Sequence, residues 1–240
     1  MFNKYWFRRF YTTEFIQVVR YYAESLRTKV VPSFDNISDE AALVEKETVD
    51  RLGQHFDPDR DDPSDCYETA HNAAVDFYVM ASRIRQGIIN MFAAGLYHLF
   101  EQQLLKLHRQ ELLSICEARG PIDADLLKLS VAKDRLSGKG INIDGFSSWG
   151  RIHNELRLVA NTVKHADGRS CADLKIVRPE FFIYPSSERN KWEQDVSQYQ
   201  VVQPLAGEDL FITLEHFEEF VTAVKTFWEE LADAVEALET

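Results

Sequence analysis

The longest helical pattern in the sequence runs from Ser64 to about Cys116. Apolar residues recur there at three- and four-residue steps, and no proline follows Pro63 within the stretch. This is the period of a helix with one broad buried stripe. Because glycine lowers helix stability by only ~1 kcal/mol, Gly87 and Gly95 leave two alternatives open, one very long helix or two helices with a kink. A segment of this length restricts the chain to a fold built from long helices.

The remainder of the sequence also favours helices. Only 10 Gly and 7 Pro occur in 240 residues, which leaves little material for the frequent tight turns of an all-β protein. Three prolines among aromatic and β-branched runs predict loops with one short hairpin in residues 171–212. Further helices are expected at 13–29, 38–52, 123–136, 149–166 and 213–240. The expected fold is an all-α bundle with long antiparallel helices and a short irregular or β-hairpin insertion.

Polar residues and glycine mark the expected helix ends. Ser38 is a predicted N-cap, as is Ser147 or Ser148 for the helix that follows them. Thr213 is the predicted N-cap of the last helix, whose apolar stripe needs a partner to cover it. Gly168 is the predicted C-cap of the helix that ends near residue 166.

Composition limits the classes of function. The net charge of −12 repels polyanions as a whole and argues against broad, nonspecific nucleic-acid binding, although a local basic site is compatible with it. The three cysteines are odd in number and lack a CxxC pair, which is typical of reduced cytoplasmic thiols. No signal peptide and no run of eighteen apolar residues is found, so we expect a soluble, cytoplasmic protein without a membrane partner.

One helix carries a polar ridge that could perform chemistry. Arg157, Asn161 and His165 stand at i, i+4 and i+8, with Lys164 beside the histidine. An imidazole can transfer a proton, an amide can orient it, and a guanidinium can hold phosphate oxygens, so the ridge suits work on a phosphodiester. The competing interpretation is structural, because a histidine near a helix C-terminus is stabilised by the helix dipole and the last carbonyls.

The same helix carries a family resemblance. The stretch WGRIHNELRLVANTVKHADG, preceded some fifty residues earlier by GLYHLFEQQL, resembles the HEPN superfamily of helical domains over roughly Ser64 to Gly168. The resemblance implies a bundle of four or more helices that forms a homodimer, with the motif helices of two protomers facing each other across a cleft. It also implies metal-independent endoribonuclease activity on RNA, in a prokaryotic toxin-antitoxin or antiphage setting, with a protein partner from the same operon.

Carried over by position, the motif's Asn falls on Asn161, its His on His165, and the acidic residue of the earlier helix on Glu101. The family's Arg falls on Ala160, which departs from its Arg-x4-6-His pattern. Two interpretations follow. Arg157 or Lys164 supplies the missing cation, or the site is degenerate and the domain is a dimerisation or interaction module, antitoxin-like or a scaffold.

In the active interpretation, His165, Asn161, Arg157 and Glu101 form the catalytic group, and Lys164 and Arg169 bind the substrate. The corresponding organisation comprises N-terminal helices (1–62), a HEPN-like helical core (63–170), a loop-rich insertion (171–212) and a C-terminal amphipathic helix packing on the core (213–240).

Two HxxE pairs raise the question of a metal centre. His98 with Glu101, and His216 with Glu219, could place carboxylate and imidazole groups inside a bundle. Their order is opposite to the Glu-x-x-His of bundle di-iron sites, and neither pair has an in-phase Glu one turn earlier. We therefore expect no metal and no cofactor.

Overall fold

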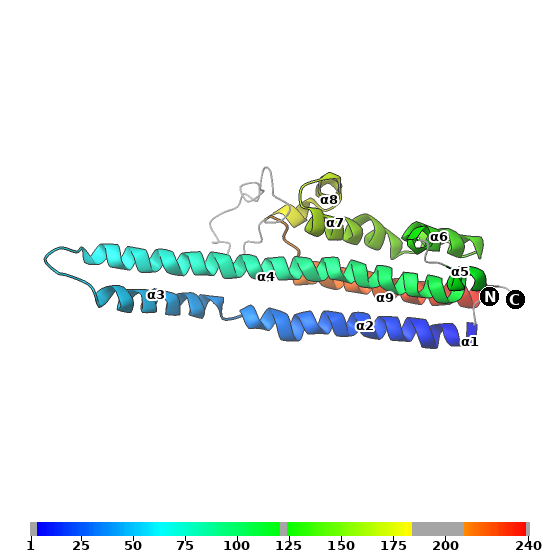
Figure 1. Ribbon diagram of the computed structural model, residues 1–240, viewed down its shortest axis with the longest axis horizontal. Coiled ribbons are helices and arrows are strands. Elements are labelled where there is room, and N and C mark those ends of the chain that lie inside the picture. The colour runs from blue at the N-terminus through cyan, green and yellow to red at the C-terminus, as the bar shows by residue number, and fades with distance from the viewer. Residues whose placement is uncertain (1–3, 121–123, 184–208, 239–240) are drawn as a thin grey trace. The chain divides into compact units, whose positions relative to one another are not determined.

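The computed structural model describes residues 4–120, 124–183 and 209–238, and the regular elements in this part of the chain are all helices, joined by loops, without a β-strand (Figure 1). The predicted all-α class is confirmed for these residues. The helices are α1 (Lys4–Phe7), α2 (Thr13–Ser25), α3 (Ile37–Gly53), α4 (Pro63–Leu107), α5 (Ile115–Arg119), α6 (Leu129–Gly138), α7 (Arg157–His165), α8 (Arg169–Val177) and α9 (Leu214–Ala237).

Short π-helical and 3-10 segments extend or join these helices. The π-helical segments are η1 (Arg8–Thr12), η2 (Leu26–Val30), η4 (His108–Leu112) and η7 (Arg151–Leu156). The 3-10 turns are η3 (Val31–Phe34), η5 (Ala124–Leu127), η6 (Ile143–Gly145) and η8 (Pro179–Phe182).

Most of the stretch predicted as helical from Ser64 to about Cys116 is a single helix, α4, which neither glycine interrupts. Segment η4 continues it to Leu112, and the chain then breaks before α5. Gly95 has another use. A Cβ atom at this position would overlap the hydroxyl of Tyr22, which donates a 3.1 Å hydrogen bond to the carbonyl of Phe92. Glycine therefore leaves the space in which this side chain of α2 lies directly against the backbone of α4.

The chain forms two compact units. The larger consists of Met1–Glu24 and Ile89–Thr240, and the smaller is Ser25–Ile88. In the smaller unit, α3 and the first half of α4 run as a helical hairpin (Figure 1). Its buried α4 residues are small, namely Ala70, Ala74 and Ala81.

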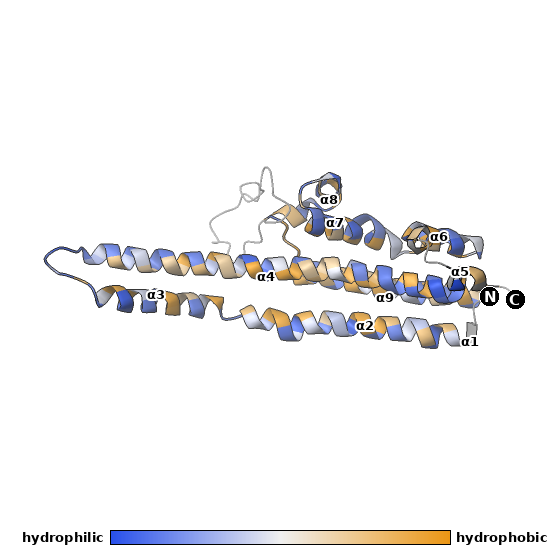
Figure 2. Cartoon of the chain, viewed as in Figure 1, coloured by the Kyte–Doolittle hydropathy of each residue, from blue (hydrophilic) through white to orange (hydrophobic). Residues whose placement is uncertain are grey.

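Helix α9 carries many hydrophobic residues (Figure 2), and the core of the larger unit is built on its buried aromatic stripe. The ring of Phe227 packs edge-on against Phe100 of α4, with centroids 4.9 Å apart, and Trp228 lies 4.6 Å from Phe15 of α2. All four side chains are buried. Burial of each large apolar side chain stabilises the fold by about 1.5–3 kcal/mol, so this stripe holds α9 against α2 and α4.

Buried polar groups tie the same helices together. The indole N–H of Trp228 donates to Oε1 of Gln103 (2.9 Å), and Nε2 of Gln103 donates to the carbonyl of Phe15 (3.2 Å). At the other end, the amide of Asn90 donates to the carbonyl of Leu210 (2.7 Å), which fixes the chain as it enters α9. Satisfied buried amides specify one packing arrangement, because any other would leave them unpaired.

Some of the predicted helix caps and boundaries are confirmed and others are wrong. The predicted cap of α9 is confirmed, since Thr213 and His216 form a reciprocal capping box. The predicted cap of α3 is wrong, because the helix already begins at Ile37 and its N-cap residue is Asn36, without a side-chain capping bond. The prediction that a loop-rich region begins at residue 171 is wrong, because residues 171–177 belong to helix α8.

The predicted hairpin coincides largely with residues 184–208, which lie outside the described residues. Among the described residues that flank 184–208, the N–H of Phe211 donates to the carbonyl of Phe181 at 2.7 Å.

One buried histidine is left without hydrogen bonds. His108 in η4 is fully buried, and neither ring nitrogen has a partner among the described residues. Burial lowers the pKa of His108, and the positive charge of Arg135 acts in the same direction. The unfolded chain binds a proton at this residue near pH 6.5, whereas the folded chain binds it only at lower pH. Stability is therefore full above about pH 6.5 and falls as the pH drops below that value.

We expect His108→Leu to raise the free energy of unfolding by about 1 kcal/mol near neutral pH, because it removes an unsatisfied buried polar ring. The variant should also lose less stability than the wild type on acidification. Urea unfolding at several pH values measures both effects. His55→Ala, at an exposed histidine, is the control, and equal pH dependence of His108→Leu and wild type would contradict the assignment.

Candidate functional site

The helix with the polar ridge is amphipathic and covers the core with one side. Segment η7 leads directly into α7, and Ile152, Leu156 and Val159 are fully buried. Ala160, at the position of the family's Arg, is only 1% exposed. The departure from the motif therefore has a physical reason, because this position faces the packed interior and has no room for a guanidinium.

A carboxylate from α9 holds the start of this helical stretch. Glu230 accepts hydrogen bonds from the backbone N–H of Ser147 (2.8 Å) and Ser148 (3.3 Å) and from the hydroxyl of Ser148 (2.6 Å). Burial opposes ionisation, but these hydrogen bonds lower the pKa of Glu230 below its usual range. The predicted cap by a serine side chain is wrong, because neither serine accepts a helix N–H and a distant glutamate occupies the N-terminus instead.

At the other end, α7 stops at His165. Ala166 adopts a positive φ of 54°, and Gly168 is extended and precedes α8. The predicted C-cap at Gly168 is therefore wrong by two residues. The sharp turn at Ala166 returns the chain so that α8 packs beside α7.

The predicted ridge exists, and its members differ in exposure. Arg157 and Asn161 are half-buried, whereas Lys164 and His165 are exposed. At 1.5 Å per residue, the backbone positions of Arg157 and His165 are ~12 Å apart along the helix. His165 is not buried against backbone carbonyls, and it makes no hydrogen bond or ion pair with the described residues. Arg169 opens α8 and is almost fully exposed, with its Nε 3.9 Å from Asp173.

Charged residues of both motif segments act on Tyr97 of α4. Burial raises the pKa of Tyr97, the nearby carboxylate of Glu101 raises it further, and the positive charge of Arg157 opposes the rise. The hydroxyl of Tyr97 therefore lies within the field of both charges. Glu101 also contacts His98, whose Nδ1 is 3.2 Å from Oε2 of the glutamate. The structure thus brings Arg157 and Glu101 into one electrostatic environment without a direct ion pair between them.

The guanidinium of Arg157 is only partly engaged. Its Nε–H donates to the carbonyl of His153 at 2.9 Å, and its remaining N–H groups have no partner among the described residues. The His153 ring stacks on Trp149, with centroids 5.0 Å apart, and burial together with the charge of Arg157 lowers the pKa of His153. The terminal N–H groups of Arg157 are available to a ligand.

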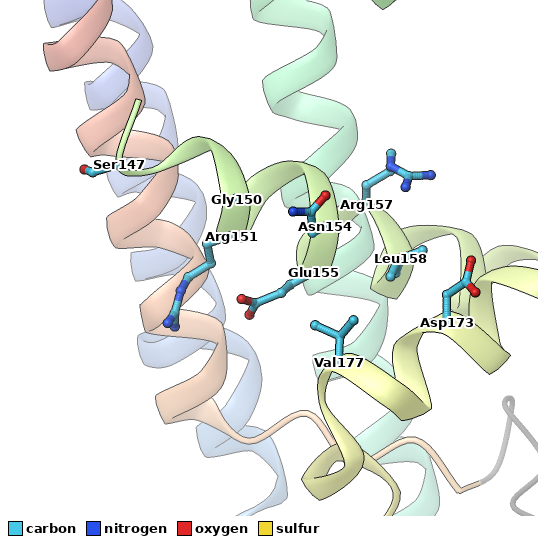
Figure 3. A pocket seen from close by; sticks show the side chains of 9 residues that line it. All are labelled: Ser147, Gly150, Arg151, Asn154, Glu155, Arg157, Leu158, Asp173 and Val177. Carbon is cyan, nitrogen blue, oxygen red and sulfur yellow. The ribbon is translucent and has the colours of Figure 1, made fainter. Parts of the chain in front are cut away.

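A groove of about 620 Å³ runs beside this helix (Figure 3). Its lining combines both signs of charge with small and apolar groups. The residues are Ser147, Gly150, Arg151, Asn154, Glu155, Arg157, Leu158, Asp173 and Val177. The groove is therefore open but electrostatically mixed.

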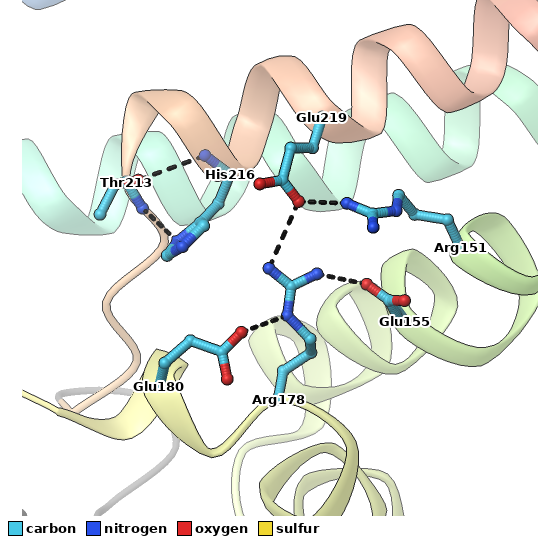
Figure 4. Close-up of polar contacts among 7 residues, drawn as sticks. All are labelled: Arg151, Glu155, Arg178, Glu180, Thr213, His216 and Glu219. Carbon is cyan, nitrogen blue, oxygen red and sulfur yellow. Dashed lines mark hydrogen bonds and ion pairs between the residues drawn. The ribbon is translucent and has the colours of Figure 1, made fainter.

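One wall of the groove is braced by a cluster of ion pairs (Figure 4). Arg178 binds Glu155, Glu180 and Glu219, and its guanidinium lies over the ring of Phe181 at 4.3 Å. Glu219 also binds Arg151, so that groove cation is already neutralised. The cluster joins η7, η8 and α9.

The HxxE pairs show no sign of a metal centre. Glu219 is engaged by arginines, and Nδ1 of His216 faces the backbone N–H of Thr213 at 3.3 Å. Among the described residues, no group of three or more His, Cys, Asp or Glu side chains is placed to hold a metal ion.

The structure adds three residues to the site that the spacing of the ridge does not predict: Tyr97, His98 and His153. Tyr97 and His98 lie inside the GLYHLFEQQL segment, about one helical turn before Glu101. His153 lies one turn before Arg157, within the motif stretch. The signal that could have found them is the i, i+3 and i+4 spacing to the assigned residues.

Comparisons with known proteins add no relative: no family model, no curated protein and no solved structure matches the chain. In the part of the chain that the structure describes, no helix is both long enough and apolar enough to cross a membrane.

An arginine at position 160, where the HEPN pattern has one, should destabilise the protein. We expect Ala160→Arg to lower the free energy of unfolding by about 3 kcal/mol, because it overpacks a buried position and introduces a charge there. Asn161→Arg, at the next residue on the outer side, should change stability by only ~0.5 kcal/mol. Chemical denaturation of both variants tests the burial of position 160, and equal stability would show that it is open.

The contribution of the ionised Glu230 carboxylate to stability should be measurable by removing its charge. Glu230→Gln is expected to lower the free energy of unfolding by about 1 kcal/mol at neutral pH, because the serine N–H groups lose an ionised acceptor. The depressed pKa gives stability that is present above about pH 4.3 and is lost as the pH falls through the folded value. The difference from wild type should therefore shrink in acid. Glu218→Gln on the same helix, where no described partner binds the carboxylate, is the control.

Proposed function

We propose that the chain is a metal-independent endoribonuclease with a HEPN-like site, acting in a prokaryotic toxin-antitoxin or antiphage setting. One observation carries the proposal. Arg157 and Glu101, which come from the two segments that resemble the HEPN motifs, share the environment of the Tyr97 hydroxyl although they are far apart in the sequence. The setting rests on the family resemblance alone.

The ridge offers a path for an RNA strand. Arg157, with its free terminal N–H groups, and Lys164 lie seven residues apart, which places them almost in line along α7. Asn161 stands between them as a neutral donor and acceptor. Since ~12 Å separates Arg157 from His165, the two residues contact different nucleotides, and Lys164 is the cation beside the scissile phosphate.

RNA carries its own nucleophile, which explains how a site without metal could act. A base removes the proton of a 2′-hydroxyl, and the oxygen then attacks the adjacent phosphorus. The bond to the 5′-oxygen breaks, and that oxygen receives a proton, leaving a 2′,3′-cyclic phosphate and a 5′-hydroxyl. His165 transfers one of these protons, and in the homodimer that the resemblance implies a second copy supplies the other. Lys164 stabilises the charge that develops on the phosphate oxygens.

The acidic net charge is compatible with this role. The charge of −12 disfavours nonspecific binding of polyanions, so recognition depends on the few cations of the ridge, including Arg169 at the start of α8. We therefore infer a narrow substrate range of structured or partner-presented RNA.

The direct test is cleavage of a labelled RNA panel with excess EDTA present. The wild type should give 2′,3′-cyclic phosphate ends, and His165→Ala should cleave about 10²- to 10⁴-fold more slowly while binding RNA almost as well, because it removes proton transfer and not phosphate contacts. His55→Ala, at an exposed histidine of the smaller unit, should behave as wild type.

Cleavage that is abolished by EDTA would contradict the proposal, as would cleavage that is unaffected by His165→Ala.

A second function is favoured by the charges of the groove. Arg151 is bound by Glu219, and Glu155 and Asp173 stand in the same lining, so the groove as a whole is not electropositive. A noncatalytic interaction module would tolerate this balance better than an enzyme that must gather RNA. RNA binding or protein-partner binding without cleavage, unchanged by His165→Ala, is the outcome that supports this alternative.

A further inference from the structure

An apolar face on the first half of α4, in the smaller unit, has no function in the site. Six residues on the first half of α4 form this face, which we call the outer face: Val75, Asp76, Val79, Met80, Arg83 and Ile84. Its four apolar side chains are between 42% and 55% exposed. The buried alanines of the same helix lie on the opposite side.

So much exposed apolar area on one short stretch is unusual. Residues 73–82 read AAVDFYVMAS, and only Asp76 among them is charged. A helix that is apolar nearly all round is normally buried, and contiguous exposed apolar groups mark an interaction surface. The smaller unit therefore exposes a face suited to a partner.

The charges on the outer face identify the partner. Asp76 and Arg83 are both exposed, and neither forms an ion pair with another described residue. They are seven residues apart, close to two helical turns, so they lie on one line along the middle of the face. Their midpoint falls between Val79 and Met80, the centre of the apolar group.

We propose that the outer face of α4 joins two copies of this chain in an antiparallel homodimer. With a two-fold axis between Val79 and Met80, Asp76 of each copy lies opposite Arg83 of the other, which forms two identical ion pairs. Val79 and Met80 lie on either side of that line, and near the axis each faces the same residue of the other copy. Ile84 packs near Phe77 of the other copy. A parallel arrangement in register would place like charges together, so the charges select the antiparallel one.

This interface is separate from the ridge on α7 and goes beyond the proposed function. It depends only on residues of the smaller unit. A dimer formed across the α7 helices would not involve Asp76 or Arg83, and the two assemblies can therefore be told apart by substitution.

Charge reversal gives a sharp test by sedimentation velocity over a range of protein concentrations at low salt. Asp76→Arg leaves two arginines opposite two arginines, and Arg83→Asp leaves two aspartates opposite two aspartates. Association through the outer face should be at least about tenfold weaker in each variant alone than in wild type, because attraction becomes like-charge repulsion. The double variant Asp76→Arg with Arg83→Asp should recover association, since the pairs are restored with exchanged partners.

Mixing adds a result that altered folding cannot imitate. An equimolar mixture of the two single variants should form a heterodimer, because every cation then faces an anion. Asp50→Arg and Lys46→Asp make the same charge changes at exposed positions of α3 and should associate as wild type.

The proposal is overturned if the wild type stays monomeric at all concentrations. It is also overturned if the single variants form the same assemblies as wild type at the same concentrations, which is the behaviour of chains that join only across α7. A mixture of the variants that forms no assembly beyond those of each variant alone overturns it as well.

Discussion

The larger unit depends on covering the aromatic stripe of α9. An isolated amphipathic helix cannot keep such side chains from water, so its fold is fixed by whatever packs on them. Phe227 is covered by Phe100 of α4 and by Trp149 at the start of the motif stretch, and Trp228 is covered by Phe15 of α2. These covering segments come from three distant parts of the sequence. Their mutual position therefore follows from one shared set of contacts.

The site inherits its geometry from that core. Helix α9, which carries the aromatic stripe, also carries two carboxylates that bind the site. Glu230 holds the N-terminal end of the motif stretch, and Glu219 binds Arg151 and Arg178. The start of the stretch and the chain after α8 are thus tied to α9, and Arg157 forms no direct salt bridge with Glu101. This arrangement is preorganised, because moving Arg157 would require repacking buried residues.

Periodicity predicted the helices well because it records burial, and the cap at Thr213 follows from signals within a few residues. The same local signals left open whether α4 is one helix or two. Interactions between distant segments left no such signal. The cap at the start of the motif stretch comes from Glu230, more than eighty residues away, and Ala166 takes the turn that glycine usually takes. The motifs were visible in the sequence, but only the structure shows that charges from both segments act on Tyr97.

The central claim is that the segment of α4 around Glu101 and the segment of α7 around Arg157 make one electrostatic site. The side-chain Nε–H signal of Arg157 in a nitrogen-15 NMR spectrum tests this without any assumption about function. If the claim holds, Glu101→Gln and Tyr97→Phe each shift that signal and leave the signal of Arg60, in the loop of the smaller unit, unchanged. An Arg157 signal that neither substitution moves would contradict it.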